Sequence, residues 1–184
     1  MLASPNEKTV LTTETPLILK GNNGVLHVDR KVEIDDKYLI STTDKITNLT
    51  NQPIRVVFNS VLTRQLEKEP ATSAVHQGFV AVLKDKLIEE KYQDVKDEAF
   101  DEPTKGGWYG VTDKYWQTAF VFDGRERGQV RFEKTGDKSY RASFEGEAIT
   151  IPAGETYTHT SRTFAGAKEI NLLTDYQNKY QIPK

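Results

Sequence analysis

Apolar side chains occupy every second position of residues 25–34: Leu26, Val28, Val32 and Ile34, with Arg30 as the single exception. Successive side chains of a strand point to opposite faces, so this period of two predicts a strand with one buried face. Polar residues 35–37 form a turn, and the β-branched run at residues 38–43 predicts a second strand.

The same rhythm continues after a cluster of turn residues at positions 48–53. Further short strands are predicted at residues 54–58, 108–111, 115–122, 130–132, 140–144, 149–151 and 156–164, with a turn at 152–155. Short strands bounded by turns are typical of a mostly antiparallel β-sandwich or barrel, and they argue against βαβ units.

Three segments depart from this pattern. Residues 1–15 are rich in Thr, Ser, Pro and Glu and predict an irregular lead-in. Residues 78–95 join a short apolar run to several helix formers, so local propensity alone favours a helix there. Residues 94–107 are acidic and contain Pro103, Gly106 and Gly107, which predicts a loop.

The end of the chain has helical periodicity. Apolar side chains fall on one arc at 3.6 residues per turn: Ile170, Leu172, Leu173, Tyr176 and Tyr180. Pro183 marks the end of the pattern. We therefore expect an amphipathic helix over residues 167–180.

Composition bounds the class of protein. A chain of 184 residues with eight Phe and eight Tyr can bury one core, so we expect a single domain over residues 1–184. The net charge of −2, without a run of like charges, excludes the footprint of a nucleic-acid or anionic-membrane binder. The absence of Cys excludes thiol catalysis, disulfides and Cys-based metal sites.

No stretch approaches the roughly 20 apolar residues of a membrane span, and the first residues do not form a signal peptide. Taken alone this pattern indicates a soluble cytosolic protein. A domain separated from its own membrane segments would look the same.

Candidate chemistry is sparse. His27, His76 and His159 lack the spacing of metal ligands on one element, and the carboxylate pairs fall at predicted turns or in the acidic loop. Nucleophile and phosphate-binding motifs are missing, and the sequon at Asn48 is a tripeptide match of low information. We expect no catalytic centre, no cofactor and no metal.

Aromatic side chains are densest in one segment: Trp108, Tyr109, Tyr115, Trp116, Phe120 and Phe122. One interpretation is a stacking platform for a sugar or an extended peptide, with Trp108, Tyr115 and Trp116 as the candidate cleft aromatics. The other, which we favour because the residues fall on both faces, is the aromatic core of two adjacent strands.

This segment also carries a resemblance to a known family. Gly106-Gly107-Trp108, Gly110 and Thr112-Asp113-Lys114-Tyr115-Trp116 resemble the G-G-W-x-G-I-T-D-K-Y-W stretch in the periplasmic domain of the YidC family of bacterial membrane protein insertases. The version here is most similar to the alphaproteobacterial branch. Three more motifs agree in order: Asp35-Asp36-Lys37-Tyr38-Leu39, Thr43-Asp44 with Thr47-Asn48, and Phe164-Ala165-Gly166-Ala167-Lys168-Glu169 with Ile182-Pro183.

The resemblance implies an antiparallel β-supersandwich of galactose-mutarotase-like architecture with a C-terminal helix, which moves residues 78–95 from helix to strands. It also implies a fragment: the family's domain has further strands ahead of Leu11, and a membrane span follows the position of Lys184. The multi-pass membrane segments and the insertase core would then lie outside this chain.

For function, the resemblance implies a non-enzymatic domain on the periplasmic face of the bacterial inner membrane. The whole protein would insert and fold nascent membrane proteins, alone or with the Sec translocon and its accessory subunits. The expected partners are the insertase membrane core in cis and Sec, without nucleic acid. Candidate contact residues are Lys168, Glu169, Tyr176 and Lys179, although packing of the helix on the sandwich explains its apolar face equally well.

Two alternatives remain open. One is a carbohydrate- or peptide-binding module that uses the aromatics near Trp116. The other is a mutarotase-like enzyme, which requires a buried His beside a Glu on a concave sheet face.

Overall fold

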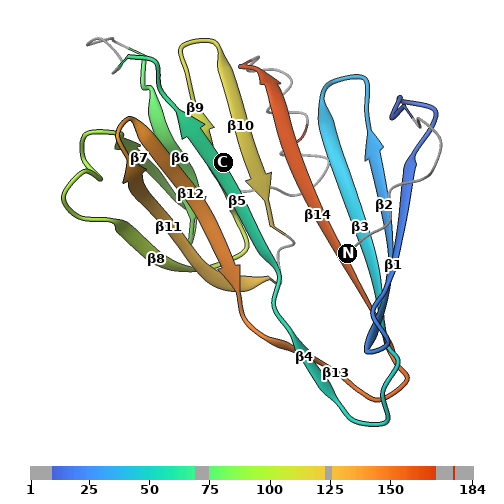
Figure 1. Cartoon of the computed structure of the whole chain (residues 1–184). Helices are drawn as coiled ribbons and strands as arrows, with labels where there is room; N and C mark the ends of the chain where they lie inside the picture. Colours follow the sequence, from blue (N-terminus) through green and yellow to red (C-terminus); the bar gives the residue numbers. More distant parts are fainter. Residues whose placement is uncertain (1–9, 69–74, 123–125, 169–175, 177–184) are drawn as a thin grey trace. The chain divides into compact units, whose positions relative to one another are not determined.

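The computed structural model describes residues 10–68, 75–122, 126–168 and 176. These residues form antiparallel strands (Figure 1): β1 Leu17–Asn22, β2 Leu26–Ile34, β3 Leu39–Asn48, β4 Ile54–Val56, β5 Asn59–Gln65, β6 Gly78–Leu83, β7 Lys86–Lys91, β8 Phe100–Lys105, β9 Trp108–Thr112, β10 Trp116–Val121, β11 Arg127–Gly136, β12 Ser139–Gly146, β13 Ile149–Ile151 and β14 Thr156–Ala167. The prediction of a mostly antiparallel β protein is confirmed.

Contacts divide the chain into two compact units. The first contains the described residues up to Val57 together with Ala148–Thr163, and the second contains the described residues from Phe58 to Glu147 and from Phe164 onward. Strand β14 contributes residues to both units, so it is the element that the two have in common.

The first unit contains a sheet in the order β1-β2-β3-β14. The predicted strands at residues 25–34 and 38–43 are confirmed as β2 and β3, and β3 extends further than predicted, to Asn48. Their register places Val28 opposite Ile46 and Arg30 opposite Asp44 on one face. On the opposite face, threonine hydroxyls join β3 to β14, with Thr47 2.8 Å from Thr156.

Asn48 closes the predicted turn at residues 48–53. Its side chain is fully buried, and its amide nitrogen donates to the carbonyl oxygens of Gln52, Ile151 and Pro152 at 2.8–3.0 Å. Its amide oxygen accepts from the backbone and the hydroxyl of Thr50. These bonds tie the turn to the end of β13. The Asn48 side chain, the first residue of the sequon match, therefore has a structural role.

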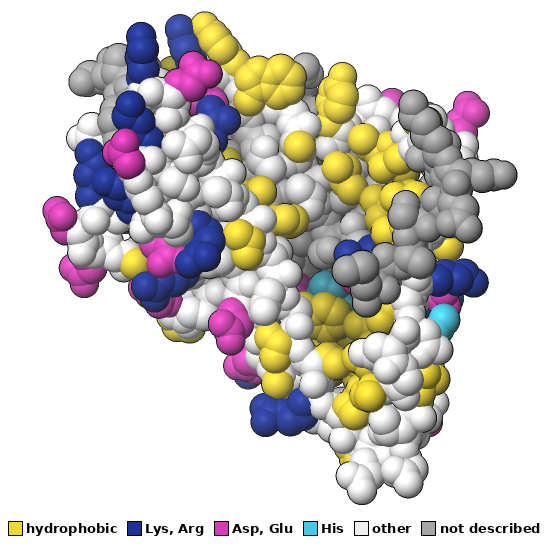
Figure 2. Space-filling view, in the orientation of Figure 1, with side chains coloured by type: hydrophobic (Ala, Val, Ile, Leu, Met, Phe, Trp, Pro, Cys, Tyr) yellow, Lys and Arg dark blue, Asp and Glu magenta, His cyan; other side chains and the backbone are white. Residues whose placement is uncertain are grey.

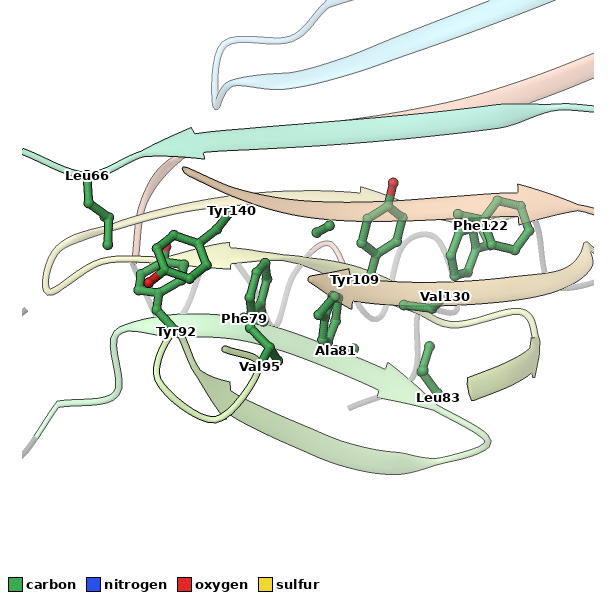
Figure 3. Close-up of a cluster of buried hydrophobic side chains, with 13 residues drawn as sticks. Leu66, Phe79, Ala81, Leu83, Tyr92, Val95, Tyr109, Phe122, Val130 and Tyr140 are labelled. Atoms are coloured by element: carbon green, nitrogen blue, oxygen red, sulfur yellow. The ribbon is translucent and has the colours of Figure 1, made fainter. Parts of the chain in front are cut away.

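The second unit has two antiparallel sheets. One continues from β14 in the order β10-β9-β6-β7, and the other has the order β5-β12-β11-β8. Their inner faces share a core of buried hydrophobic side chains (Figure 3). Within it, Phe79 of β6 stacks on Phe132 of β11, with ring centroids 4.6 Å apart. Thirteen buried residues form this core: Leu66, Phe79, Ala81, Leu83, Tyr92, Val95, Tyr109, Phe122, Val130, Phe132, Tyr140, Ala142 and Phe144.

Strand β6 shows why residues 78–95 are not helical. All six of its residues are buried, because it lies between β7 and β9 and both of its faces are covered. Lys84 and Asp85 connect it to β7 with φ angles of 52° and 60°, the positive pair of a tight hairpin turn. Local propensity gave the wrong answer here, and the strands implied by the resemblance are confirmed.

Residues 94–107 are not only a loop, as their composition predicted, because β8 forms within them. It is an edge strand of its sheet and pairs with β11 alone. Pro103 lies opposite Gln129, and an edge strand tolerates proline because one of its sides needs no N–H donors. Strands β1 and β5 were also not predicted. The predicted helix at 167–180 lies outside the described residues, apart from Ala167, Lys168 and Tyr176.

Candidate functional site

The hairpin of β9 and β10 contains the densest aromatic segment, and its glycines allow close backbone packing. A Cβ on Gly107 would collide with the carbonyl oxygen of Val82, and a Cβ on Gly110 would collide with that of Thr118. Gly107 also has φ of 99°, a conformation that L side chains rarely adopt. The fold therefore requires glycine at positions 107 and 110.

Tyr109 lies on the inner face of this hairpin. It is fully buried, stacks against Phe122 with centroids 5.6 Å apart, and donates its hydroxyl to the carbonyl oxygen of Ser60 at 2.9 Å. Burial raises the pKa of Tyr109, and a second hydrogen bond, with the Ser60 hydroxyl at 2.9 Å, opposes that shift only in part. For Tyr109 and Phe122, together with half-buried Phe120, the interpretation as an aromatic core is confirmed.

Tyr115 and Trp116 behave differently. Their exposed fractions are 64% and 60%, and they lie in and beside the turn that joins β9 to β10. The turn is closed by a 2.8 Å hydrogen bond from the backbone N–H of Asp113 to the carbonyl oxygen of Trp116. The ammonium of Lys114 lies 4.9 Å from the centre of the Tyr115 ring, within cation–π range.

Trp108 is not brought together with these two aromatics. It is opposite Val121 at one end of the hairpin, whereas Trp116 adjoins the pair of Gln117 with Thr112 at the other end. The four steps from Trp108 to Thr112 span about 14 Å at about 3.4 Å per residue. The three candidate cleft aromatics therefore split into an exposed pair and a separate, half-buried Trp108.

The candidate contact residues divide in a similar way. Lys168 donates its backbone N–H to the carbonyl oxygen of Tyr115 at 2.9 Å, which joins the end of β14 to the turn after β9. Tyr176 is buried, and its ring packs edge-on against Phe164 with centroids 6.1 Å apart. Glu169 and Lys179 lie outside the described residues.

Two residues that the sequence reasoning missed complete the turn. Arg64 of β5 donates to the carboxylate of Asp113 at 2.6 Å and so fixes the start of the turn. Lys114 is the second, and its place in the Thr-Asp-Lys-Tyr-Trp motif was the available signal. No local sequence pattern could predict the ion pair of Arg64 with Asp113, because the two residues are 49 positions apart.

In the described part of the first unit, the buried carboxylate of Asp44 is paired with the part-exposed guanidinium of Arg30, on the face of the sheet opposite the threonine contacts. Arg30 donates from Nε and Nη2 to the two carboxylate oxygens of Asp44, both at 2.7 Å, and Asp44 is only 4% exposed. The side-chain hydrogen bond to Asp44 raises the pKa of Arg30. The threonine contacts set a register in which His159 of β14 falls opposite Asp44.

The other histidines are placed separately. Nε2 of His27 lies 3.3 Å from the Asp29 carboxylate, and Nε2 of His76 is 2.8 Å from the carbonyl oxygen of Phe79. Among the described residues no group of three His, Cys, Asp or Glu side chains could hold a metal ion. The same part of the chain contains no helix long and apolar enough to cross a membrane.

Comparison with known proteins shows which family the sequence matches. The model of the YidC periplasmic domain matches residues 2–182. The chain is 36% identical to the membrane protein insertase YidC of Beijerinckia indica, 35% to that of Agrobacterium fabrum and 32% to that of Rhizobium etli. Each match covers 97% of this chain and 31% of the relative, so the chain spans about a third of the length of these proteins.

Solved structures with a similar fold are more distant in sequence. A protein from Synechocystis sp. PCC 6803 matches with a TM-score of 0.62 and 7% identity, covering 91% of this chain and 66% of its own. A galactose mutarotase related enzyme from Lactobacillus acidophilus matches with a TM-score of 0.56 and 10% identity, covering 84% of this chain and 68% of its own. At such low identity the likeness concerns the fold alone.

Proposed function

This chain belongs to the YidC periplasmic-domain family, and from that premise we propose that it is a non-enzymatic accessory domain of an inner-membrane protein insertase. The full-length protein would help membrane proteins to insert and fold, alone or together with the Sec translocon. This chain would supply a rigid platform on the periplasmic face of the membrane. The single observation that carries the proposal is the family match over residues 2–182.

The geometry supports a platform because the groups that could do chemistry are held in structural contacts. Arg30 occupies both carboxylate oxygens of Asp44, and the ring of His76 contacts a backbone carbonyl. Glu133 accepts from Arg131 and Arg141. A mutarotase-like enzyme would need a His beside a Glu, whereas the register of β14 pairs His159 with an Asp that is already bound to Arg30.

The finer fold assignment is part of the proposal. We infer that the complete domain is a β-supersandwich of the mutarotase-like type and that residues 1–184 form one domain of it. In this proposal further strands precede the chain, and the segment after β14 leads to a membrane span. The two sheets of the second unit and the TM-score of 0.56 to the mutarotase-related enzyme support this architecture.

The C-terminal segment is the part that we propose couples the platform to the insertase core or to Sec. Contacts of Lys168 and of Tyr176 support this role. Lys168 is hydrogen-bonded to the turn after β9, and Tyr176 is anchored on Phe164, so the segment is joined to the platform at both points. Lys168, Glu169 and Lys179 are then the candidate contacts with the partner.

The test is a complementation assay in a full-length insertase that carries this domain. Charge removal at Lys168, Glu169 and Lys179 should leave the thermal stability of the domain unchanged and reduce the insertion of a reporter membrane protein. Replacement of Lys86 and Glu89, which lie on exposed positions of β7, is the matched control. Normal insertion by the triple variant would remove the coupling role.

The alternative, a carbohydrate- or peptide-binding module, is favoured by one observation, the exposure of Tyr115 and Trp116. Titration of tryptophan fluorescence with sugars and with extended peptides distinguishes it from a platform. A saturable change in the emission of Trp116 would support the binding module, and a flat response to both ligand classes would exclude it.

A further inference from the structure

The turn at residues 113–116, here named the hairpin tip, carries a surface feature that the platform function does not use. Tyr115 and Trp116 are adjacent, and both are about as exposed as any large apolar side chain that the structure describes. Hydrophobic side chains gather at the end of β9 and β10 in the upper part of Figure 2. An adjacent exposed Tyr and Trp are unfavourable in water unless a partner covers them.

The backbone of the hairpin tip is already hydrogen-bonded within the protein. The carbonyl oxygen of Trp116 accepts from Asp113, and that of Tyr115 accepts from Lys168. The hydroxyl of Thr112 lies 3.4 Å from the carbonyl oxygens of both Asp113 and Trp116. These hydrogen bonds reduce the number of polar groups that would have to give up water if the turn enters a less polar medium.

The charges around the tip favour an anionic partner. Asp113 is paired with Arg64 at 2.6 Å, which leaves the Lys114 ammonium, 4.9 Å from the centre of the Tyr115 ring, as a cation beside the exposed aromatics. Lys114 already lies over the Tyr115 ring, and its flexible stem allows the ammonium to move toward a phosphate while the ring is buried.

We propose that the hairpin tip docks at the boundary between the headgroups and acyl chains of a phospholipid bilayer, with Trp116 and Tyr115 inserted and Lys114 against the lipid phosphates. Tyr and Trp concentrate at this depth of membranes because their rings are apolar and their tips are polar. The curated relatives are membrane protein insertases, so a bilayer is the surface that a domain of this family meets.

A small solute is the weaker candidate for the same side chains. Sugar and cofactor sites are concave, whereas Tyr115 and Trp116 belong to a four-residue turn at the end of a hairpin. The chain has a net charge of −2 and no run of basic residues, so the contact with lipid would be shallow and would depend on the two aromatic rings, with Lys114 adding one local ionic contact. The proposal goes beyond the platform function, since lipid contact does not depend on Sec or on insertion activity.

The experiment uses the absence of Cys in this chain. A single Cys added after Lys184 couples the chain to a maleimide lipid in vesicles of phosphatidylethanolamine and phosphatidylglycerol with brominated acyl chains. Trp108→Phe leaves Trp116 as the sole tryptophan. We expect its emission to shift to the blue and to lose intensity relative to vesicles without bromine.

The matched control moves the reporter to another exposed apolar position of the same unit. Leu87 on β7 is 61% exposed, so a chain with Trp108→Phe, Trp116→Phe and Leu87→Trp places a tryptophan away from the tip. Its emission should be insensitive to bromine. Equal quenching of both reporters, or quenching of neither, would show that the tip does not dock and would overturn the proposal.

The untethered chain provides a second measurement. The double variant Tyr115→Ala/Trp116→Ala should lower the partition coefficient onto the same vesicles by at least about tenfold, equivalent to about 1.4 kcal/mol. Leu87→Ala should leave it unchanged, and Lys114→Ala should weaken binding only when phosphatidylglycerol is present. A Trp116 response to sugars or peptides, without one to lipid, would identify a solute site and refute the bilayer contact.

Discussion

The backbone N–H of Lys168 donates a 2.9 Å hydrogen bond to the carbonyl oxygen of Tyr115. This bond joins the end of β14 to the hairpin tip, so the two groups of candidate residues are not independent. A change at the end of β14 is transmitted directly to the turn that presents Tyr115 and Trp116. That coupling gives the first prediction.

Lys168→Pro removes the N–H donor and should loosen the hairpin tip. A typical net hydrogen bond contributes about 1 kcal/mol, so the amide of Asp113 should exchange with solvent about fivefold faster. Hydrogen exchange followed by NMR measures this rate. Lys168→Ala keeps the donor and should leave the rate unchanged; the same acceleration in both variants would show that the side chain, and not the bond, holds the tip.

Gly110→Ala should destabilise the second unit strongly. The added Cβ would collide with the backbone carbonyl oxygen of Thr118, which cannot move without breaking the pairing of β9 with β10. The free energy of unfolding in urea should fall by about 3 kcal/mol. Gly24→Ala is the control, because its Cβ would meet nothing within 4 Å and only its φ of 81° resists substitution, at about 1 kcal/mol. Equal losses would remove the packing explanation for the motif.

Replacing Arg30 and replacing Asp44 should lower the free energy of unfolding by different amounts. Arg30→Met leaves the carboxylate of Asp44 buried without its partner and should lower the free energy of unfolding by about 3 kcal/mol. Asp44→Asn leaves a half-exposed guanidinium that can reach water, so the loss should be about 1 kcal/mol. Urea denaturation compares the two variants, and the reverse order would contradict the burial argument.

Glu133 should contribute to stability in a pH-dependent way. Partial desolvation opposes its ionisation, but hydrogen bonds from Arg141 and Arg131 outweigh that effect and lower its pKa. A carboxylate with a lowered pKa in the folded state stabilises above its unfolded pKa of about 4.3 and loses that contribution as pH falls through the folded value. Glu133→Gln should therefore be less stable than the wild type at about pH 7.

The difference between the two proteins should shrink toward zero in acid, below both pKa values, when thermal unfolding is compared at several pH values. Lys134→Ala, at an exposed position of the same strand, serves as a control with no carboxylate to titrate. A difference that stays constant with pH would mean that Glu133 acts by packing alone.

Tyr38→Asn should stabilise the first unit. Tyr38 has φ of 66° and a side chain that is 59% exposed, so a bulky residue is held in a left-handed conformation that Asn tolerates better. We expect a gain of about 1 kcal/mol in the free energy of unfolding. Tyr38→Phe keeps the strain and should show no gain. If Tyr38→Asn is also neutral, the backbone at this turn is not strained.

The alternation of apolar side chains was sufficient to predict the strands that have one buried face, such as β2. It failed for β6, whose residues are buried on both sides and so show no alternation at all. Strand β8 was missed because Pro103 and the acidic side chains suit an edge strand as well as a loop, and only the partner β11 decides between them.

The candidate site was predictable in composition but not in arrangement. The motif identified Tyr115 and Trp116, yet their strand and turn positions depend on a register that begins at the pair of Gln117 with Thr112. The partnership of Arg64 with Asp113 and that of Lys168 with Tyr115 join residues 49 and 53 positions apart, and no local pattern specifies either.

The division of the first unit between two stretches of chain has a consequence for folding during synthesis. Strand β3 reaches its neighbour β14 only when the contact between Thr43 and Thr160 can form, 117 residues later in the chain. Until then its edge has open hydrogen-bonding groups, while β5 to β12 can already pair among themselves. A chain that emerges N-terminus first at its site of folding can therefore pair most strands of its second unit before its first is complete, and the edge of β3 stays open until β14 follows.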